Sequence, residues 1–155
     1  GSGAGTIYGT TGGVAEAVVR HCMPDKSRNT LRALEYSPLR GNESIREATI
    51  PVGDREIKLA VVHGLINAQK LLKEIDEGTA YYDLIEVMTC PNGCVGGAGQ
   101  PYGLKAKKQA RSAGLYATDR SAPFKRAEYN PGVTSILQKL THEQRHELLH
   151  VSYQK

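Results

Sequence analysis

The fold is decided by the stretch Asp83-Leu84-Ile85-Glu86-Val87-Met88-Thr89-Cys90-Pro91-Asn92-Gly93-Cys94-Val95-Gly96-Gly97-Ala98-Gly99-Gln100-Pro101. Within it, an apolar run at residues 84–88 leads into a turn with two cysteines and then into a glycine-rich loop. The apolar run has the length of a buried strand. In open α/β sheets ligands bind where parallel strands end, so the two cysteines stand where a site is expected.

The residues before this stretch predict a second strand and a connecting helix. Ile57, Leu59 and Val61 alternate, with Ala60 and Val62 between them, which is typical of a strand covered on both faces. Residues 65–76 are expected to form a helix that ends near Gly78. Its apolar stripe consists of Leu65, Ala68, Leu71, Leu72 and Ile75. A strand, a helix and a strand of these lengths predict a right-handed βαβ unit with parallel strands.

The remaining elements are expected on both sides of this unit. A short helix is predicted over residues 14–22, and its N-terminus after Gly12-Gly13 would favour a nearby anion. Residues 23–43 are polar and are expected to form an irregular surface excursion. A strand at 45–52 and a turn at Gly53-Asp54 then lead into the strand of the βαβ unit.

Two further helices are predicted in the C-terminal third. One spans residues 104–113 and is closed by Gly114, and the last spans residues 141–153. Thr141 and Gln144 have the spacing of a capping box. The predicted fold is therefore α/β, with βαβ units and a parallel or mixed sheet flanked by helices, followed by a helical C-terminal tail.

Size and composition narrow the class of protein. The chain has 155 residues, 39% of them hydrophobic and 23% charged, which fits one soluble globular domain. No apolar run approaches the roughly 20 residues of a membrane span. An odd number of cysteines, three, argues against a secreted disulfide framework and favours the cytoplasm. Since the chain opens on glycine rather than methionine, we expect it to be a piece of a longer protein, with the remnant of a tag as the alternative.

Positive charge is concentrated in residues 102–126, which carry seven Lys and Arg residues against one Asp, within a net charge of +4. Such a stretch can bind nucleic acid or an acidic partner, but it is more often the solvated face of a helix. No aromatic residues are interleaved with the basic cluster at 105–111, so we expect no nucleic-acid partner.

The cysteine turn itself has the chemistry of a metal site. Thiolates are soft ligands for iron–sulfur clusters, and Pro91 and Gly93 provide a turn that can aim two sulfurs at one centre. The glycines that follow let backbone N–H groups approach sulfur. Cys90 and Cys94 are half of the usual four ligands. Zinc, a strained disulfide or a turn with two incidental thiols remain alternatives, whereas Cys22 is expected to be a small buried apolar residue on its helix.

Three segments carry a resemblance to one family. The run from Ile85 to Pro101 resembles the last cysteine motif of the iron-only ([FeFe]) hydrogenases. The opening residues 2–5 and 8–17 are similar to the segment that precedes this motif in the family. The tail His146-Glu147-Leu148-Leu149-His150, followed by Tyr153, is similar to the family's C-terminal segment, which sometimes forms a separate small subunit.

The resemblance implies a cofactor and roles for three residues. Cys90 would ligate the [4Fe–4S] cubane of the hydrogen-activating H-cluster. Cys94 would ligate the same cubane and bridge to the di-iron subsite, and Met88 would lie against that subsite. The implied reaction is 2H⁺ + 2e⁻ ⇌ H₂. Residues 1–115 would be the C-terminal lobe of the catalytic domain, and residues 116–155 a small-subunit-like helical tail that packs on it.

The chain also departs from the family pattern. Two cysteine motifs that supply the other cubane ligands have no counterpart here. Thr89, Asn92 and Ala15 replace the residues more common at those positions. We therefore expect the chain to be inactive alone, to need the N-terminal part of the same protein, and to exchange electrons with a ferredoxin-like partner. A non-catalytic cluster-binding or sensory domain is an alternative.

A competing motif lies in the tail, where His146, Glu147 and His150 match the H-E-x-x-H signature of zinc peptidases. A catalytic zinc needs a third protein ligand downstream, and residues 151–155 offer none. The preferred interpretation is a helix that packs Leu148 and Leu149 inward, with a zinc metallopeptidase as the alternative.

Overall fold

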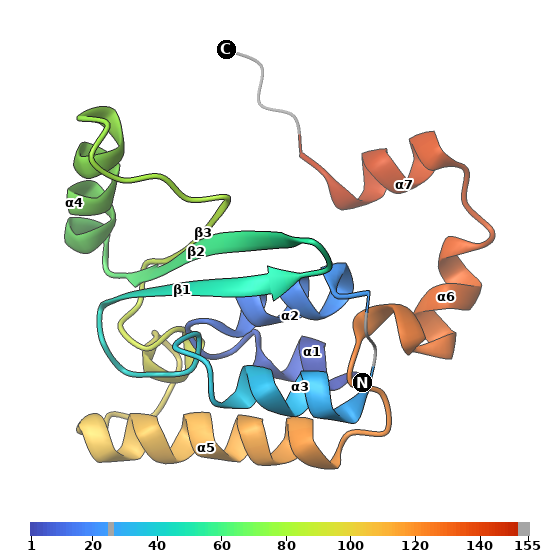
Figure 1. Ribbon diagram of the computed structural model, residues 1–155. Coiled ribbons are helices and arrows are strands. Elements are labelled where there is room, and N and C mark those ends of the chain that lie inside the picture. The colour runs from blue at the N-terminus through green and yellow to red at the C-terminus, as the bar shows by residue number, and fades with distance from the viewer. Residues whose placement is uncertain (25–26, 152–155) are drawn as a thin grey trace.

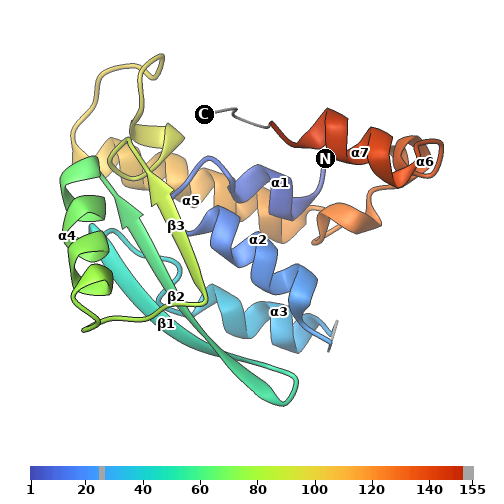
Figure 2. The ribbon, with the colours of Figure 1, turned by 90° about the horizontal axis from the view of Figure 1, so that it is seen from above.

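The computed structural model describes residues 1–24 and 27–151, in which a three-stranded sheet lies between two layers of helices (Figures 1 and 2). The strands are β1 (Ile45–Val52), β2 (Arg55–His63) and β3 (Leu84–Met88), in the order β1-β2-β3. β1 and β2 are antiparallel, whereas β2 and β3 are parallel, with His63 opposite Met88. The predicted α/β fold with a mixed sheet is confirmed.

Helix α4 (Leu65–Asp76) connects the two parallel strands and covers one face of the sheet (Figure 2). Its core contacts join Ala68 and Leu71 to Ala60 and Val62 of β2. The predicted stripe was only partly right, because the helix is rotated so that Leu65 and Leu72 are 62% and 56% exposed.

The opposite face of the sheet is covered by α2 (Gly13–Cys22) and α3 (Arg28–Glu35). The buried cluster there consists of Ala15, Val19, Met23, Leu34, Leu39, Ala48, Ile50, Leu59 and Val61. The prediction of an irregular surface excursion at 23–43 is wrong, since α3 lies within it and two leucines of this segment are in the core. The prediction that Cys22 is buried is also wrong. Cys22 is the last residue of α2 and is exposed, although it lies on the same helical face as the buried Ala15 and Val19.

A further layer is formed by α1 (Gly3–Ile7) and the long helix α5 (Lys105–Ser121), which pack against each other beyond α2 (Figure 2). The predicted end of this helix at Gly114 is wrong. A glycine inside a helix costs only about 1 kcal/mol. Continuation of α5 by two turns brings Asp119 into the interior, where it is 1% exposed.

The tail consists of η2 (Ala127–Tyr129), α6 (Pro131–Leu137) and α7 (His142–Leu149). The capping box of Thr141 and Gln144 is confirmed. The inward packing of Leu148 and Leu149 is wrong, because they are 68% and 62% exposed. The predicted helix ends at Leu149, and Tyr153 lies outside the described residues. Among the helices in the described ranges, none is long and apolar enough to cross a membrane.

Candidate functional site

The cysteine turn begins directly after β3, at the carboxyl end of the two parallel strands, as the sequence predicted. Met88, Thr89, Cys90, Gly93 and Cys94 line a small cavity of about 170 Å³. All three cysteines of the chain are free thiols, with Cys90 half-buried and Cys94 exposed at the start of η1 (Cys94–Gly96). The structure therefore brings the three predicted site residues together around one cavity.

The backbone of the turn is held in one conformation by positive φ angles and tight packing. Asn92 and Gly93 have φ angles of 68° and 84°, and the Gly93 N–H donates to the Cys90 carbonyl at 3.0 Å. A Cβ on Gly96 would lie 2.1 Å from the Pro91 carbonyl oxygen, and one on Gly93 would lie 2.9 Å from the Thr11 nitrogen. Only glycine fits these two positions, so the spacing of the cysteines and glycines sets the direction of both thiols.

The loop between α1 and α2 is hydrogen-bonded to the cysteine turn. The Thr11 N–H donates to the Asn92 carbonyl at 3.2 Å, and the Val95 N–H donates to the Gly9 carbonyl at 3.0 Å. The loop is itself tightly packed at Gly12 and Gly13, where a Cβ would lie 1.9 Å from the Leu39 carbonyl oxygen and 1.8 Å from the Ile7 carbonyl oxygen.

Glu86 supports the site from behind, and its role was missed in the sequence. Its carboxylate is buried and accepts hydrogen bonds from the N–H groups of Gly12 at 2.6 Å and Ala15 at 2.7 Å. The anion expected at the N-terminus of α2 is therefore a side chain of the protein itself. Since Glu86 lies two residues before Met88 on β3, it fixes the end of the strand against α2. A charged residue on the inward-facing side of an apolar strand was the signal that could have identified it.

Arg111 holds the other side of the turn. Its guanidinium donates to the carbonyls of Val95 at 2.9 Å and Pro101 at 2.6 Å, and so fastens both ends of the glycine-rich loop to α5. The next residue, Ser112, lies 3.2 Å from the Thr10 hydroxyl. The basic stretch is thus only in part the solvated helix face that its charge suggested, because Arg111 has a structural role.

A buried ionic cluster joins α5 to α2. Arg20 contacts Asp119 at 2.7 Å and Glu16 at 2.5 Å, and all three side chains are at most 2% exposed. Arg40 adds contacts to Glu16 at 2.8 Å and to Asp119 at 3.0 Å, and its guanidinium stacks 4.2 Å above the Tyr116 ring. Burial disfavours the Asp119 carboxylate, but the hydrogen bonds and positive charge of Arg20 outweigh it and lower its pKa. The cluster is compensated in charge and ties three segments together.

His63 lies at the end of β2, opposite Met88 in the parallel register, and is 6% exposed. Its Nε2 atom is buried and has no hydrogen-bond partner among the described residues. Burial lowers the pKa of this imidazole, although a hydrogen bond to the Asn42 backbone opposes the shift. Asn42 also accepts a hydrogen bond from the Asn92 side chain at 3.1 Å, which links His63 to the cysteine turn.

The donor set fits part of an iron–sulfur cluster. Two free thiols face one cavity, and the cradle behind them is closed by Gly97, where a Cβ would lie 3.2 Å from the Cys90 Sγ atom. Within residues 1–24 and 27–151, no group of three or more Cys, His, Asp and Glu side chains has the arrangement of a metal site. The chain thus supplies two ligands, and a complete cubane needs others.

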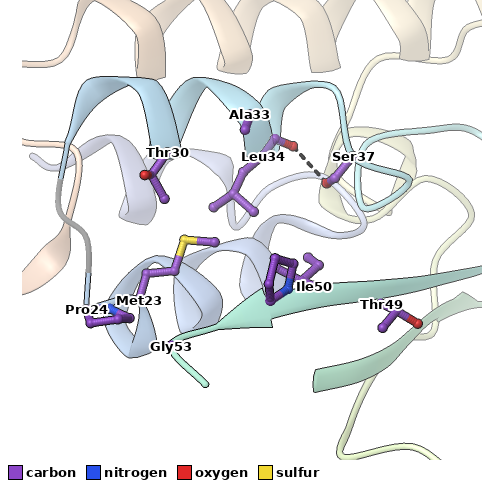
Figure 3. A pocket seen from close by; sticks show the side chains of 10 residues that line it. Met23, Pro24, Thr30, Ala33, Leu34, Ser37, Thr49, Ile50 and Gly53 are labelled. Atoms are coloured by element: carbon purple, nitrogen blue, oxygen red, sulfur yellow. Dashed lines mark hydrogen bonds between the residues drawn. The ribbon is translucent and has the colours of Figure 1, made fainter. Parts of the chain in front are cut away.

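Two other places in the described chain lack the cysteine ligands of an iron–sulfur site. An apolar pocket of about 480 Å³ between α3 and β1 is lined by Met23, Leu34 and Ile50, and none of its lining residues is a Cys, His, Asp or Glu (Figure 3). On α7, His150 lies beyond the last helical residue, and its ring stacks on that of His146 with centroids 4.7 Å apart.

Comparison with known proteins gives the family. Residues 1–98 match the family described as the iron only hydrogenase large subunit, C-terminal domain, and residues 105–155 match the iron hydrogenase small subunit. The chain belongs to the iron-only hydrogenase family. The resemblance drawn from the cysteine motif and the two flanking segments is confirmed.

The similar proteins include hydrogenases and a different kind of iron–sulfur protein. The chain is 38% identical, over 99% of its length, to the NADP-reducing hydrogenase subunit HndD of Solidesulfovibrio fructosivorans, and covers 27% of that protein. It is 33% identical over 94% of its length to the cytosolic iron-sulfur assembly component 3 of Mus musculus, covering 31% of it. The [FeFe]-hydrogenase HydA1 of Chlamydomonas reinhardtii superposes with a TM-score of 0.70 at 31% identity, over 94% of this chain and 45% of HydA1. The chain therefore spans less than a third of these two curated relatives.

Proposed function

We propose that this chain supplies the cysteine turn of a hydrogenase-type H-cluster within a larger iron–sulfur protein. The observation that carries the proposal is the meeting of Cys90, Cys94 and Met88 around one cavity at the carboxyl end of β3. Bound there, the cluster would supply reversible reduction of protons to H₂. The membership of the chain in the iron-only hydrogenase family supports this cofactor over zinc.

The three site residues have different proposed roles. Cys90, half-buried beside Gly97, ligates the [4Fe–4S] cubane from the protein side. Cys94, which is exposed, would ligate both the cubane and the di-iron subsite. Met88 lines the same cavity and packs against that subsite. The remaining cubane ligands come from polypeptide outside these 155 residues, so the isolated chain has no hydrogenase activity.

The division of the chain into a lobe at 1–115 and a tail at 116–155 is part of this proposal. The large-subunit and small-subunit families match residues 1–98 and 105–155, which supports two successive parts but puts the change between them at residues 98–105. Three free cysteines are compatible with a reducing cytoplasm.

Electrons are proposed to reach the cluster from an acidic, ferredoxin-like carrier. Lys105, Lys107 and Lys108 lie in the first turn of α5, which contains no acidic residue, and Lys108 approaches the glycine-rich loop at Gly96. Opposite charges accelerate such encounters. Charge reversal at Lys107 and Lys108 is expected to slow reduction by the carrier, and an unchanged rate would remove this part of the proposal.

The experiment is anaerobic reconstitution of the full-length gene product that contains this chain, with ferrous iron and sulfide. We expect iron and sulfide to bind in stoichiometric amounts, with a broad absorption that Cys90→Ser or Cys94→Ser abolishes. Uptake of stoichiometric zinc with no iron would contradict the proposal and favour the peptidase alternative.

A second candidate is a non-catalytic cluster-binding role, favoured by the 33% identity to an iron-sulfur assembly component. Thr89 and Asn92 in the turn, where the family more often has other residues, fit such a divergent branch. The same reconstituted protein separates the two candidates. Hydrogen evolution from a chemical reductant after di-iron loading supports the first, and a bound cubane with no turnover supports the second.

A further inference from the structure

We propose that α5 is a separable element that docks on the rest of the chain through the buried carboxylate of Asp119. This docking sets the conformation of the cysteine turn. The family matches divide the chain at the same place, since residues 1–98 and 105–155 match two different subunits. The inference requires no bound cluster, because it concerns contacts within the folded chain.

Docking depends on a buried group of charges that is neutralised only by a helix with a carboxylate at the position of Asp119. Within residues 1–98, Arg20 and Arg40 face one fully buried carboxylate, that of Glu16, while Glu35, which lies 3.7 Å from Arg40, is 23% exposed; the buried groups alone therefore carry one positive charge in excess. Asp119 of α5 cancels that charge through contacts of 2.7 Å to Arg20 and 3.0 Å to Arg40. Removing one partner of a buried ion pair is strongly unfavourable, because the remaining charge stays desolvated. A docked helix without a carboxylate here is therefore disfavoured.

The fit between the start of the chain and the end of α5 also favours a carboxylate at position 119. The N–H groups of Gly3 and Ala4 donate to the carbonyls of Phe124 at 2.7 Å and Lys125 at 3.0 Å, immediately after α5. A Cβ on Gly3 would lie 2.0 Å from an Asp119 carboxylate oxygen. The glycine near the chain start thus makes room for the docking carboxylate.

Docking reaches the cysteine turn through residues two turns earlier on α5. Arg111 binds the Val95 and Pro101 carbonyls, and Ser112 pairs with Thr10. The residue after Thr10 donates its N–H to Asn92, between the two cysteines. When α5 leaves, the turn loses the contacts that hold it on this side. We therefore expect docking of α5 to change the reactivity of Cys90, which is half-buried.

The test separates the two parts after the chain has folded. A protease site is inserted after Gly99, an exposed position where an added Cβ would have no other atom within 4 Å, and the folded chain is cleaved there. Size-exclusion chromatography of the cleaved protein measures whether the two fragments remain together. Asp119→Asn is compared with Asp54→Asn, which makes the same chemical change at an exposed turn residue.

We expect the cleaved wild type and Asp54→Asn to stay associated, and Asp119→Asn to bind at least about 100-fold more weakly. Alkylation of Cys90 should accelerate when the fragments separate, and the same chain with the protease site left uncleaved is the control. Wild-type fragments that separate at micromolar concentration would overturn the docking claim, even if Asp119→Asn does not fold. Unchanged Cys90 reactivity in separated fragments would overturn the coupling.

Discussion

Replacement of Glu86 by alanine should destabilise the chain more than any other single surface or strand carboxylate change. The carboxylate accepts two buried hydrogen bonds, at 2.6 Å and 2.7 Å, from the first turn of α2. Hydrogen bonds to a charged group contribute about 1.5–3 kcal/mol each, and the helix N-terminus adds about 0.3–1 kcal/mol. The expected loss in free energy of unfolding is therefore about 3–7 kcal/mol, or a fall in Tm of roughly 6–28 °C.

Urea unfolding followed by circular dichroism measures this loss. Glu86→Gln keeps one acceptor oxygen but no charge, so its loss should be about half that of Glu86→Ala. Glu56→Ala, at an exposed position of β2, is the control and should stay within about 0.5 kcal/mol of wild type. A loss below about 1 kcal/mol for Glu86→Ala would refute the argument that this carboxylate fixes β3 against α2.

Four further substitutions test other parts of the structure. Gly96→Ala should lower the free energy of unfolding by about 1–3 kcal/mol or more, because its Cβ would lie 2.1 Å from a carbonyl oxygen. Gly114→Ala should raise it by up to about 1 kcal/mol, since nothing lies near its Cβ. Urea unfolding compares the two. Burial lowers the pKa of His63, so the unfolded chain takes up a proton before the folded chain as the pH falls. The free energy of unfolding should therefore fall from about pH 7 to pH 5, by at most about 1.4 kcal/mol per pH unit. His63→Gln should remove most of this slope, and an unchanged slope would contradict the role of His63. His146→Ala should leave the zinc content of the dialysed chain unchanged, and a stoichiometric loss of zinc would restore the peptidase alternative.

The βαβ unit could be predicted because its signals are local. Apolar runs of strand length, a helical stripe and Gly78 after the helix are each contained within a few residues. The rotation of α4 could not be predicted in this way. Its apolar residues cover more than one face, and only packing against β2 decides that Ala68 and Leu71 are buried.

The buried polar residues were the main failure of sequence reasoning. Glu16 and Arg20 are four residues apart, which in a sequence is the pattern of an exposed helical ion pair. Their partners, Arg40 and Asp119, are distant in sequence, so nothing local shows that the pair is buried. The same long-range contacts stabilise the part of α5 that continues beyond Gly114.

The site was predictable to the extent that its residues are contiguous. Met88, Cys90 and Cys94 lie within seven residues, and a strand end followed by a glycine-rich turn brings them together. The residues that support them come from other segments: Glu86 acts through α2, and Arg111 through α5. Their types, a buried acid in a strand and one arginine among several basic residues, do not identify their partners.

The most direct test of the central claim is the iron content of the full-length gene product after anaerobic reconstitution, measured with each cysteine of this chain replaced in turn. The account predicts that Cys90→Ser and Cys94→Ser lose cluster iron, whereas Cys22→Ser, exposed and remote from the cavity, binds as much iron as wild type. Full iron binding by both turn variants would contradict the assignment of Cys90 and Cys94 as cluster ligands.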